Sequence, residues 1–189
     1  MRKEAILILD HFKLDSRVAV ITGGNRGLGL GIATALAEAG ADIVSTQRTG
    51  EAPRLGEAVA HAGRRVLPLA LDLTADGAAD GALAATLRHF GRVDILVNNA
   101  GVQRRAPAAA FSLTDWDAVV AVDLRAVFAF SQAFGREMLH QGRGKIINVT
   151  SLLAFQGGVT IPAYVASKHG VVGLTQALCN EWGPVTVST

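Results

Sequence analysis

Tyr164 and Lys168 are the residues whose types and spacing most directly suggest chemistry. Tyr164 is the only tyrosine in 189 residues, and Lys168 follows it four positions later. On a helix, positions i and i+4 lie one above the other on the same face. A free tyrosine, with a pKa of ~10, is a poor base at neutral pH, but a nearby cation favours its phenolate. The pair therefore predicts a general acid/base for carbonyl reduction or alcohol oxidation, with an ordinary helix-surface contact as the alternative.

The glycine-rich stretch TGGNRGLG, residues 22–29, is a second candidate site. Gly23, Gly27 and Gly29 permit a tight turn and let a pyrophosphate approach the backbone, while the helix behind them supplies free N–H groups. Between an apolar strand and a helix, such a loop predicts a dinucleotide-binding site. The alternative is a turn that uses glycine only for its positive φ.

The elements that must position these residues alternate between apolar strands and alanine-rich helices. We expect strands over 17–22, 42–46, 65–73, 93–101 (with its exit loop) and 144–151. We expect helices over 29–40, 51–62, 79–91, 114–142 and 162–182. Thr114 is the expected N-cap of the longest helix, and Gly40 the stop of the first. Apolar strands alternating with helices indicate a Rossmann-type α/β fold, a doubly wound parallel sheet that binds ligands beyond the carboxyl ends of its strands.

Composition and charge restrict the class of protein. Half of the residues are apolar, and the chain has 18 Lys and Arg residues against 16 Asp and Glu residues, so its net charge is small. The longest basic cluster, Arg104–Arg105, is too small for a nucleic-acid surface. No uninterrupted apolar run reaches the ~20 residues that span a membrane, and one cysteine, Cys179, suits a reducing cytoplasm. We therefore expect a cytoplasmic protein with no nucleic-acid partner, no membrane and no metal, made of an N-terminal extension (1–11) and one domain (12–189).

Three motifs in this order resemble the classical short-chain dehydrogenase/reductase family. They are TGGNRGLG (22–29), NNAG (98–101) and YxxxK (164–168), and the resemblance runs from about Phe12 to Trp182. Within the family, NNAGVQRRA, DWDAVVAVDLRAVF and SLLAFQGGVTIPAYVASKHGVVGLT look most like sugar-acid dehydrogenases acting on deoxy-keto-gluconates and gluconates. The resemblance implies an NAD(P)-dependent oxidoreductase that interconverts a secondary alcohol and a ketone, on a gluconate-like small-molecule substrate.

The resemblance also implies the catalytic roles. Tyr164 transfers the proton, Lys168 favours the phenolate and holds the nicotinamide ribose, and Ser151, after the fifth strand, holds the substrate oxygen. For Ser151, the cap of a helix or turn is the alternative. Asp123 departs from the family, which has an asparagine there that holds a water on the way to the lysine. Asp123 can hold the same water, and its charge would raise the pKa of Lys168, unless it points elsewhere.

For the cofactor, the end of the second strand distinguishes NAD from NADP. NAD-preferring members usually have an acid there, but this chain has Gln47 followed by Arg48, and Arg26 in the glycine-rich loop. Two guanidinium groups and no acid suit a 2′-phosphate, so we expect NADP, with NAD as the alternative. The expected cofactor-binding residues are Thr22, Gly23, Asn25, Arg26, Gly27, Leu28, Gly29, Arg48, Asp72, Leu73, Asn98, Ala100, Gly101, Tyr164 and Lys168.

The expected substrate contacts are Arg104, Arg105, Ser151 and Gln156. Either arginine is suited to hold a sugar-acid carboxylate, and two exposed loop arginines are the alternative. After CNEW (179–182) the family continues into further strands and a mobile helix, so the resemblance implies a chain truncated or frameshifted at its C-terminus. Full-length relatives are commonly homo-oligomers, which is doubtful for this chain. The alternative function is a truncated dinucleotide-binding fragment that is weakly active or inactive, and marginally stable.

Overall fold

A six-stranded parallel sheet forms the centre of the computed structural model, which describes residues 8–183 and 187–188. Its order is β3-β2-β1-β4-β5-β6. The strands are β1 (Val18–Thr22), β2 (Asp42–Gln47), β3 (Val66–Ala70), β4 (Ile95–Asn98), β5 (Gly144–Asn148) and β6 (Val187–Ser188). Because the order reverses direction at β1, the predicted doubly wound α/β sheet is confirmed.

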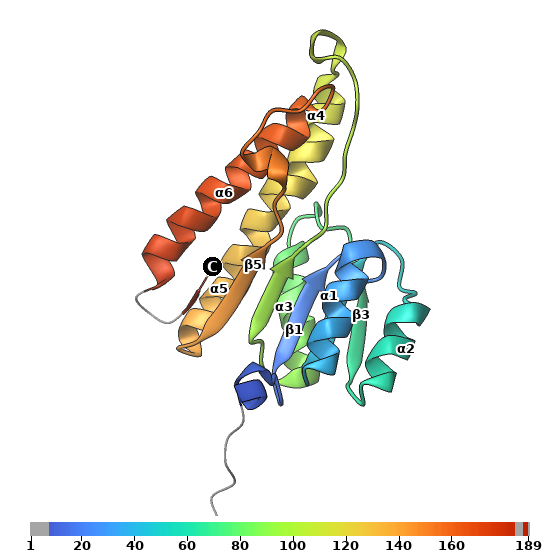
Figure 1. Cartoon of the computed structure of the whole chain (residues 1–189), viewed down its shortest axis with the longest axis vertical. Coiled ribbons are helices and arrows are strands. Elements are labelled where there is room, and N and C mark those ends of the chain that lie inside the picture. The colour runs from blue at the N-terminus through green and yellow to red at the C-terminus, as the bar shows by residue number, and fades with distance from the viewer. Residues whose placement is uncertain (1–7, 184–186, 189) are drawn as a thin grey trace, which may run out of the picture.

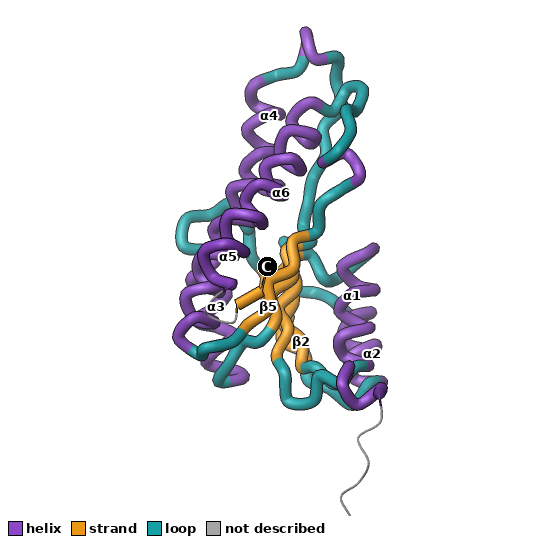
Figure 2. The backbone as a smooth tube through the Cα atoms, turned by 60° about the vertical axis from the view of Figure 1, so that its left-hand side comes forward, coloured by secondary structure: helices purple, strands orange, loops and turns teal. Residues whose placement is uncertain are grey.

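Helices cover both faces of this sheet. They are α1 (Gly27–Glu38), α2 (Pro53–His61), α3 (Ala78–Phe90), α4 (Leu113–Val120), α5 (Ala126–His140) and α6 (Pro162–Trp182). Short 3-10 turns are η1 (Ile8–Phe12), η2 (Ala108–Ala110) and η4 (Leu152–Ala154). Helices α1 and α2 lie on one side of the sheet, and α3 and α5 lie on the other (Figures 1 and 2). The predicted N-terminal extension, 1–11, lies outside the described residues except for its last part, which belongs to η1.

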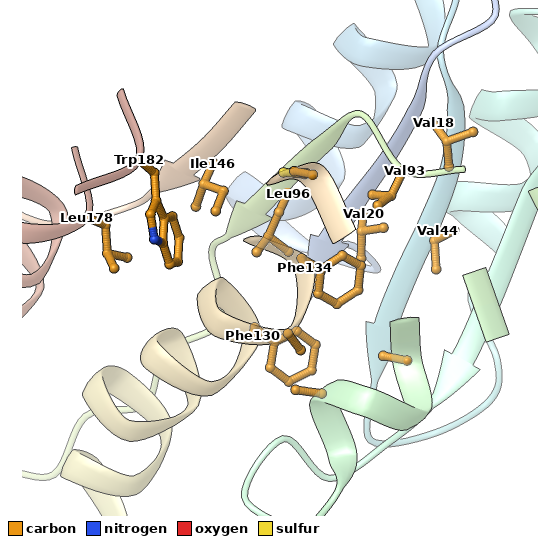
Figure 3. Close-up of a cluster of buried hydrophobic side chains, with 14 residues drawn as sticks. Val18, Val20, Val44, Val93, Leu96, Phe130, Phe134, Ile146, Leu178 and Trp182 are labelled. Carbon is orange, nitrogen blue, oxygen red and sulfur yellow. The ribbon is translucent and has the colours of Figure 1, made fainter. Parts of the chain in front are cut away.

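Two hydrophobic clusters lie on the two sides of the sheet, which explains why the inner strands are apolar throughout. Strands β1 and β4 are buried along their whole length. One cluster joins alternate residues of β1 and β2 to α1 and α2. The other joins the intervening residues to α5 and the end of α6, with Phe130 and Phe134 stacked at a ring distance of 5.9 Å (Figure 3). Side chains that alternate between two covered faces are typical of a parallel sheet.

The edge of the sheet differs from the sequence prediction, which ended the sheet at the fifth strand. A two-residue strand, β6, pairs with Gly144 and Lys145 of β5. Ile146 of β5 is buried, while Ile147 is 43% exposed. Among the residues that the structure describes, strand β5 is therefore paired with β4 from Lys145 to Asn148, but on its other side only at Gly144 and Lys145.

The predicted helix over 114–142 is three segments rather than one. Its N-cap is Ser112, not Thr114, since the Ser112 hydroxyl accepts a hydrogen bond from the Asp115 backbone N–H at 3.0 Å. Between α4 and α5 lies a π-helical turn, η3 (Ala121–Arg125). Such turns insert an extra residue into an α-helix, are rare, and occur frequently at functional sites.

One continuous helical stretch, Leu113–His140, is long and apolar enough to cross a membrane by length and composition alone. Half of its apolar window is buried inside the protein, where α5 packs against β4, β5 and α3. A core helix of an α/β fold passes the same test, and this packing accounts for the apolar composition of the stretch.

Candidate active site

A cleft of about 890 Å³ lies at the carboxyl ends of β1 to β4, where a doubly wound sheet binds ligands. We call it the carboxyl-edge cleft. Its lining includes twelve of the predicted site residues: Gly23, Asn25, Arg26, Gly27, Leu28, Gly29, Arg48, Asp72, Leu73, Ala100, Gly101 and Arg104. It also includes residues that were not predicted: Thr46, Gln47, Thr49, Leu71, Thr74, Asn99, Val102, Ala118, Ala121 and Val122.

The glycine-rich loop forms one wall of the cleft, and its conformation requires glycine at two places for different reasons. Gly23 has a φ of +69°, a region that side chains disfavour. At Gly29, a Cβ atom would overlap the Gly23 carbonyl oxygen and lie 2.5 Å from Nδ2 of Asn99. The following helix, α1, begins without a side-chain cap, so its first N–H groups are free to bind an anion.

Thr22 and Asn98 lie beneath the cleft and are not part of its lining. The Thr22 hydroxyl accepts hydrogen bonds from the backbone N–H groups of Asn99 and Ala100, both at 3.0 Å. The Asn98 amide donates to Ser131 at 3.1 Å and to Asn148 at 2.8 Å. The structure therefore gives both side chains contacts that hold the ends of β1, β4 and β5 together.

The end of β2 lies beside the glycine-rich loop, since the Gly23 N–H donates to the Thr46 carbonyl at 2.8 Å. Gln47 is 6% exposed, while Arg48 and Arg26 are exposed, and all three line the cleft. Asp72 accepts hydrogen bonds from the backbone N–H and hydroxyl of Thr74, at 2.9 and 2.7 Å. These bonds to Thr74 hold the pKa of Asp72 below its usual value, with a smaller contribution from Arg48.

Tyr164 and Lys168 lie one turn apart on α6, as predicted, with the Lys168 ammonium 5.6 Å from the centre of the Tyr164 ring. Lys168 is only 4% exposed, and its Nζ donates to the Val149 carbonyl oxygen at 3.0 Å. The Thr150 hydroxyl donates to the Lys168 carbonyl at 3.2 Å. These bonds tie α6 to the segment that follows β5.

Asp123 lies in the π-helical turn η3 and is fully buried. Its Oδ1 accepts a hydrogen bond from the Val102 backbone N–H at 2.8 Å, which joins η3 to the loop after β4. Its Oδ2 has no hydrogen-bond partner within the described chain. This oxygen lies close to Gly101, 3.4 Å from the position that a Cβ would occupy there. Most buried polar atoms in proteins have a hydrogen-bond partner, so the surroundings of this oxygen bear directly on the ionisation of Asp123.

Burial dominates the ionisation of Asp123 and Lys168. It raises the pKa of Asp123, against the opposing effects of the Val102 N–H and the Lys168 charge. It lowers the pKa of Lys168, and the charge of Asp123 opposes this shift. The sequence analysis expected Asp123 to raise the pKa of Lys168. The effect of Asp123 has that sign, but desolvation outweighs it, so the net direction is the reverse.

Ser151 is the N-cap of η4, as the alternative interpretation expected, since its Oγ accepts from the Leu153 backbone N–H at 3.2 Å. Its hydroxyl can still donate, because an O–H group is both donor and acceptor. The turn η4 packs against α6, which holds Ser151 beside the helix of Tyr164. The structure therefore brings three of the four predicted catalytic residues, Ser151, Tyr164 and Lys168, onto two packed elements, and Asp123 lies on η3, which also contacts α6.

Among the predicted substrate residues, Arg104 lines the carboxyl-edge cleft, whereas Arg105 and Gln156 are exposed and outside its lining. Arg104 pairs with Asp115 of α4 at 3.4 Å. Asp115 is half-exposed, so the pair remains open to water. No group of three or more metal-ligating side chains occurs in the ranges that the structure describes.

The family model for short chain dehydrogenases matches residues 17–189. The 2-dehydro-3-deoxy-D-gluconate 5-dehydrogenase of Escherichia coli is 46% identical over 177 residues, which cover 93% of this chain and 70% of that protein. The gluconate 5-dehydrogenase of Gluconobacter oxydans is 38% identical over 175 residues, 92% of this chain and 68% of that protein. A solved structure, a gluconate 5-dehydrogenase from Burkholderia cenocepacia in complex with NADP and tartrate, matches with a TM-score of 0.89 and 41% identity. The match covers 95% of this chain and 71% of the Burkholderia cenocepacia chain.

The chain thus spans about 70% of the length of these relatives. Its match to the family model runs through the glycine-rich loop, the carboxyl-edge cleft and the Tyr164–Lys168 helix. The chain therefore belongs to the short chain dehydrogenase family and is an NAD(P)-dependent oxidoreductase by descent and by fold.

Proposed function

We propose that this chain interconverts a secondary alcohol and a ketone on a gluconate-type sugar acid, with NADP as the preferred cofactor. The observation that carries the proposal is the buried Lys168 ammonium 5.6 Å from the Tyr164 ring, on a helix joined to the strand end beside the carboxyl-edge cleft. An ammonium beside a phenol stabilises the phenolate, so the phenol can give and take a proton near neutral pH.

The residues of the cleft fit a dinucleotide. The missing Cβ at Gly29 lets α1 pack directly on the Gly23 carbonyl and the Asn99 amide, which fixes the shape of the loop, and the uncapped N-terminus of α1 supplies donors for a pyrophosphate. Arg26, at the N-terminus of α1, and Arg48, directly after β2, add positive charge to the cleft lining and suit a 2′-phosphate. The nicotinamide, when bound, supplies the hydride transfer.

The remaining steps belong to this chain's own side chains. Tyr164 exchanges a proton with the substrate oxygen, and Ser151, fixed by its bond from Leu153, donates to the same oxygen. Lys168, held by the Val149 carbonyl, stabilises the phenolate. Asp123 takes the place that an asparagine has in the family, with its Oδ2 available to receive a proton.

A sugar acid as the substrate is supported by the relatives, which are named for 2-dehydro-3-deoxy-D-gluconate and gluconate. On this chain, Arg104 in the cleft lining is the group suited to bind a carboxylate. Of the two adjacent arginines, we assign this role to Arg104, because Arg105 is outside the lining.

The direct test is a binding titration with NADPH and NADH, followed by assays of the same protein on gluconate, 2-deoxygluconate and 2-dehydro-3-deoxygluconate. We expect tighter binding of NADPH and turnover of at least one sugar acid, measured by the absorbance of the reduced nicotinamide. Tyr164→Phe is the matched control, since it keeps the ring and removes the hydroxyl. If neither dinucleotide binds, the proposal is wrong.

A second candidate function is dinucleotide binding without turnover. The observation in its favour is that the chain spans about 70% of its relatives' length. The same experiment distinguishes the two, because this candidate predicts saturable NADPH binding with no sugar-acid turnover above that of the Tyr164→Phe control.

We further propose that residues 12–189 act as one domain in the cytoplasm, on a small-molecule substrate and without a nucleic-acid or membrane partner. The single cysteine, Cys179, is free and exposed, which suits a reducing compartment.

A further inference from the structure

Three consecutive residues at the end of β5 are hydrogen-bonded to α6, the helix of the proposed catalytic pair. The Asn148 amide donates to the Thr175 hydroxyl at 2.9 Å. The Val149 carbonyl accepts from the Lys168 ammonium at 3.0 Å, and the Thr150 hydroxyl donates to the Lys168 carbonyl at 3.2 Å. Two of these bonds involve the lysine itself. The bond between Asn148 and Thr175 lies about two turns further along α6, so it takes no direct part in the proposed chemistry.

The Asn148 amide belongs to a chain of hydrogen bonds that all run in one direction. Its Oδ1 accepts from the Asn98 amide at 2.8 Å, and its Nδ2 donates to Thr175. The Thr175 hydroxyl donates in turn to the Val171 carbonyl of α6 at 2.7 Å. The Asn98 amide also donates to Ser131 of α5 at 3.1 Å. Turning the Asn148 amide over would break its bonds on both sides, so the chain fixes α6 relative to β4 and β5.

The position of α6 along β5 affects the distance between the Lys168 ammonium and the Tyr164 ring. The ring moves with the helix, whereas the ammonium is bonded to the Val149 carbonyl at the strand end. If α6 moves along β5, the lysine side chain must bend or leave that carbonyl, and the distance of 5.6 Å to the ring centre changes. The effect of the ammonium on a phenolate is electrostatic, so it depends on this distance.

We propose that Asn148 and Thr175 are positioning residues for the proton transfer. Their hydrogen bond sets the register of α6 on β5, and the register sets the place of the Lys168 ammonium beside the Tyr164 phenol. Neither residue lines the carboxyl-edge cleft. The inference rests on the proposed function, since it assigns a role to the same tyrosine and lysine.

The test uses the fact that Tyr164 is the only tyrosine of the chain, so the absorbance of its phenolate can be titrated without turnover. Thr175→Val keeps the branched shape and removes the hydroxyl that accepts from Asn148. A helix that is held less firmly spreads the ammonium over more positions and weakens its average effect on the phenolate. We expect the midpoint of the absorbance titration to move to higher pH by a few tenths of a unit. We also expect kcat to fall on the order of 10-fold, with NADPH binding within about twofold of the parent.

Thr86→Val is the matched control. Thr86 is also a helical threonine, and its hydroxyl also donates to the carbonyl four residues earlier, that of Ala82 at 2.8 Å, but it lies on α3. This variant should leave the midpoint and kcat unchanged. Thr175→Ser keeps the hydroxyl and should restore both to the parent values. Asp123, whose charge also acts on Lys168, is the same in every variant.

Asn148→Leu combined with Thr175→Val removes the same bond and makes both partners apolar. Replacing both partners leaves fewer buried polar groups unpaired than removing one, so the double variant should melt at a higher temperature than Thr175→Val. Its midpoint and kcat should stay displaced, because the bond is still missing. Recovery of stability without recovery of the midpoint separates positioning from a purely structural role.

A midpoint and a kcat equal to those of Thr86→Val, in both the single and the double variant, overturn the inference and leave the proposed function standing. In a parent that binds NADPH without turnover, the midpoint alone decides. A parent chain that binds neither dinucleotide overturns the proposed function, and the assignment of Asn148 and Thr175 to the proton transfer with it.

Discussion

At the scale of single residues, Lys168 is a cation that the fold has almost removed from water. Its ammonium has one hydrogen bond, to the Val149 carbonyl, and lies near the Tyr164 ring. Burial lowers the pKa of Lys168, and the charge of Asp123 works against that shift. The charge that we propose to stabilise a Tyr164 phenolate therefore depends on these neighbours, and substitutions of each can test the proposal.

Tyr164→Phe should abolish most turnover and leave dinucleotide binding almost unchanged. The variant keeps the ring near which Lys168 lies and loses the hydroxyl that exchanges the proton. General acid/base groups contribute about 10²- to 10⁴-fold, so kcat should fall by that factor. The measurement is steady-state kinetics beside an NADPH titration of the same preparation. Turnover within a few-fold of the parent would remove Tyr164 from the proton transfer.

Asp123→Asn should change how stability depends on pH. Burial raises the folded-state pKa of Asp123 above 3.8, so its favourable contribution is full below 3.8 and is lost as pH rises through the folded pKa. Asparagine does not titrate, so the variant does not lose this contribution to stability as pH rises. The stability of the variant relative to the parent should therefore increase from acidic toward neutral pH.

Chemical denaturation of both proteins at several pH values measures this difference. Asp117→Asn, the same substitution at an exposed position of α4, is the control and should give a nearly constant difference. A flat difference for Asp123→Asn as well would show that the carboxyl group has the same pKa in the folded and the unfolded chain, and would contradict the shift caused by burial.

At the scale of elements, the loop between β1 and α1 is the part whose shape depends most on glycine. The close approach at Gly29 leaves no room for a Cβ between the Gly23 carbonyl and the Asn99 amide. Because Asn99 follows β4, this packing also joins the loop to the neighbouring strand end, through bonds to the carbonyls of Thr22 and Gly23 at 2.9 and 3.3 Å.

Gly29→Ala should weaken NADPH binding by at least tenfold and destabilise the chain by about 1–3 kcal/mol, the usual effect of overpacking. Gly31→Ala, two residues along the same helix, is the matched control. Gly31 is exposed with open space around it, so alanine there should stabilise the helix by up to about 1 kcal/mol and leave binding unchanged. Thermal melts and titrations check both variants. Equal behaviour of the two would contradict the close-approach argument.

The order and type of the main elements, and most of the cleft lining, could be predicted from the sequence because they depend on local patterns. Apolar runs predict buried strands, and a glycine-rich turn before a helix predicts a phosphate loop. The contacts of Thr22 and Asn98 could not be predicted, because their partners come from other strands and from α5. Gln47 was recognised only as a missing acid, because the orientation of its amide depends on the hydrogen bond from the Ser45 hydroxyl to its Oε1.

The π-helical turn also escaped the sequence analysis. The stretch from Leu113 to His140 is apolar on most of its faces, so one extra residue does not visibly change the spacing of its apolar residues. Its N-cap was placed two residues late, because Ser112 and Thr114 are both good capping residues and only the bond from Asp115 distinguishes them. Local preference thus located the helix but not its internal irregularity.

At the scale of the whole molecule, the sheet is well covered on its faces and less well at one edge. Strand β6 pairs only with Gly144 and Lys145, and the rest of β5 has no strand on that side among the described residues. Ile147, in this part of β5, is 43% exposed. Exposed apolar edges promote pairing between chains, and natural proteins often protect them with charge.

Ile147→Lys should therefore reduce self-association without loss of stability. The long lysine side chain can keep its charge in water while its methylenes cover the strand. Light scattering of concentrated samples measures the association, and a thermal melt checks the fold. Leu113→Lys, which adds the same charge at a 78% exposed position on α4, is the control and should have the smaller effect. Equal reductions would show that net charge, not the edge, governs association.

The π-helical turn between α4 and α5 has a consequence for which changes of chain length the protein tolerates. A π turn closes over one residue more than an α turn, so it takes in an extra residue without rotating the side chains that follow it. Upstream, α4 packs against α6, while downstream α5 turns Phe130, Phe134 and Met138 toward the sheet. Deleting one residue from 121–125 should therefore give a regular α-helix and leave those three side chains directed toward the core. The same deletion within 126–140 has no wide turn to absorb it and should turn the side chains beyond it away from the core. The π turn is thus the place where this helix can change its length by one residue and keep both of its halves in register.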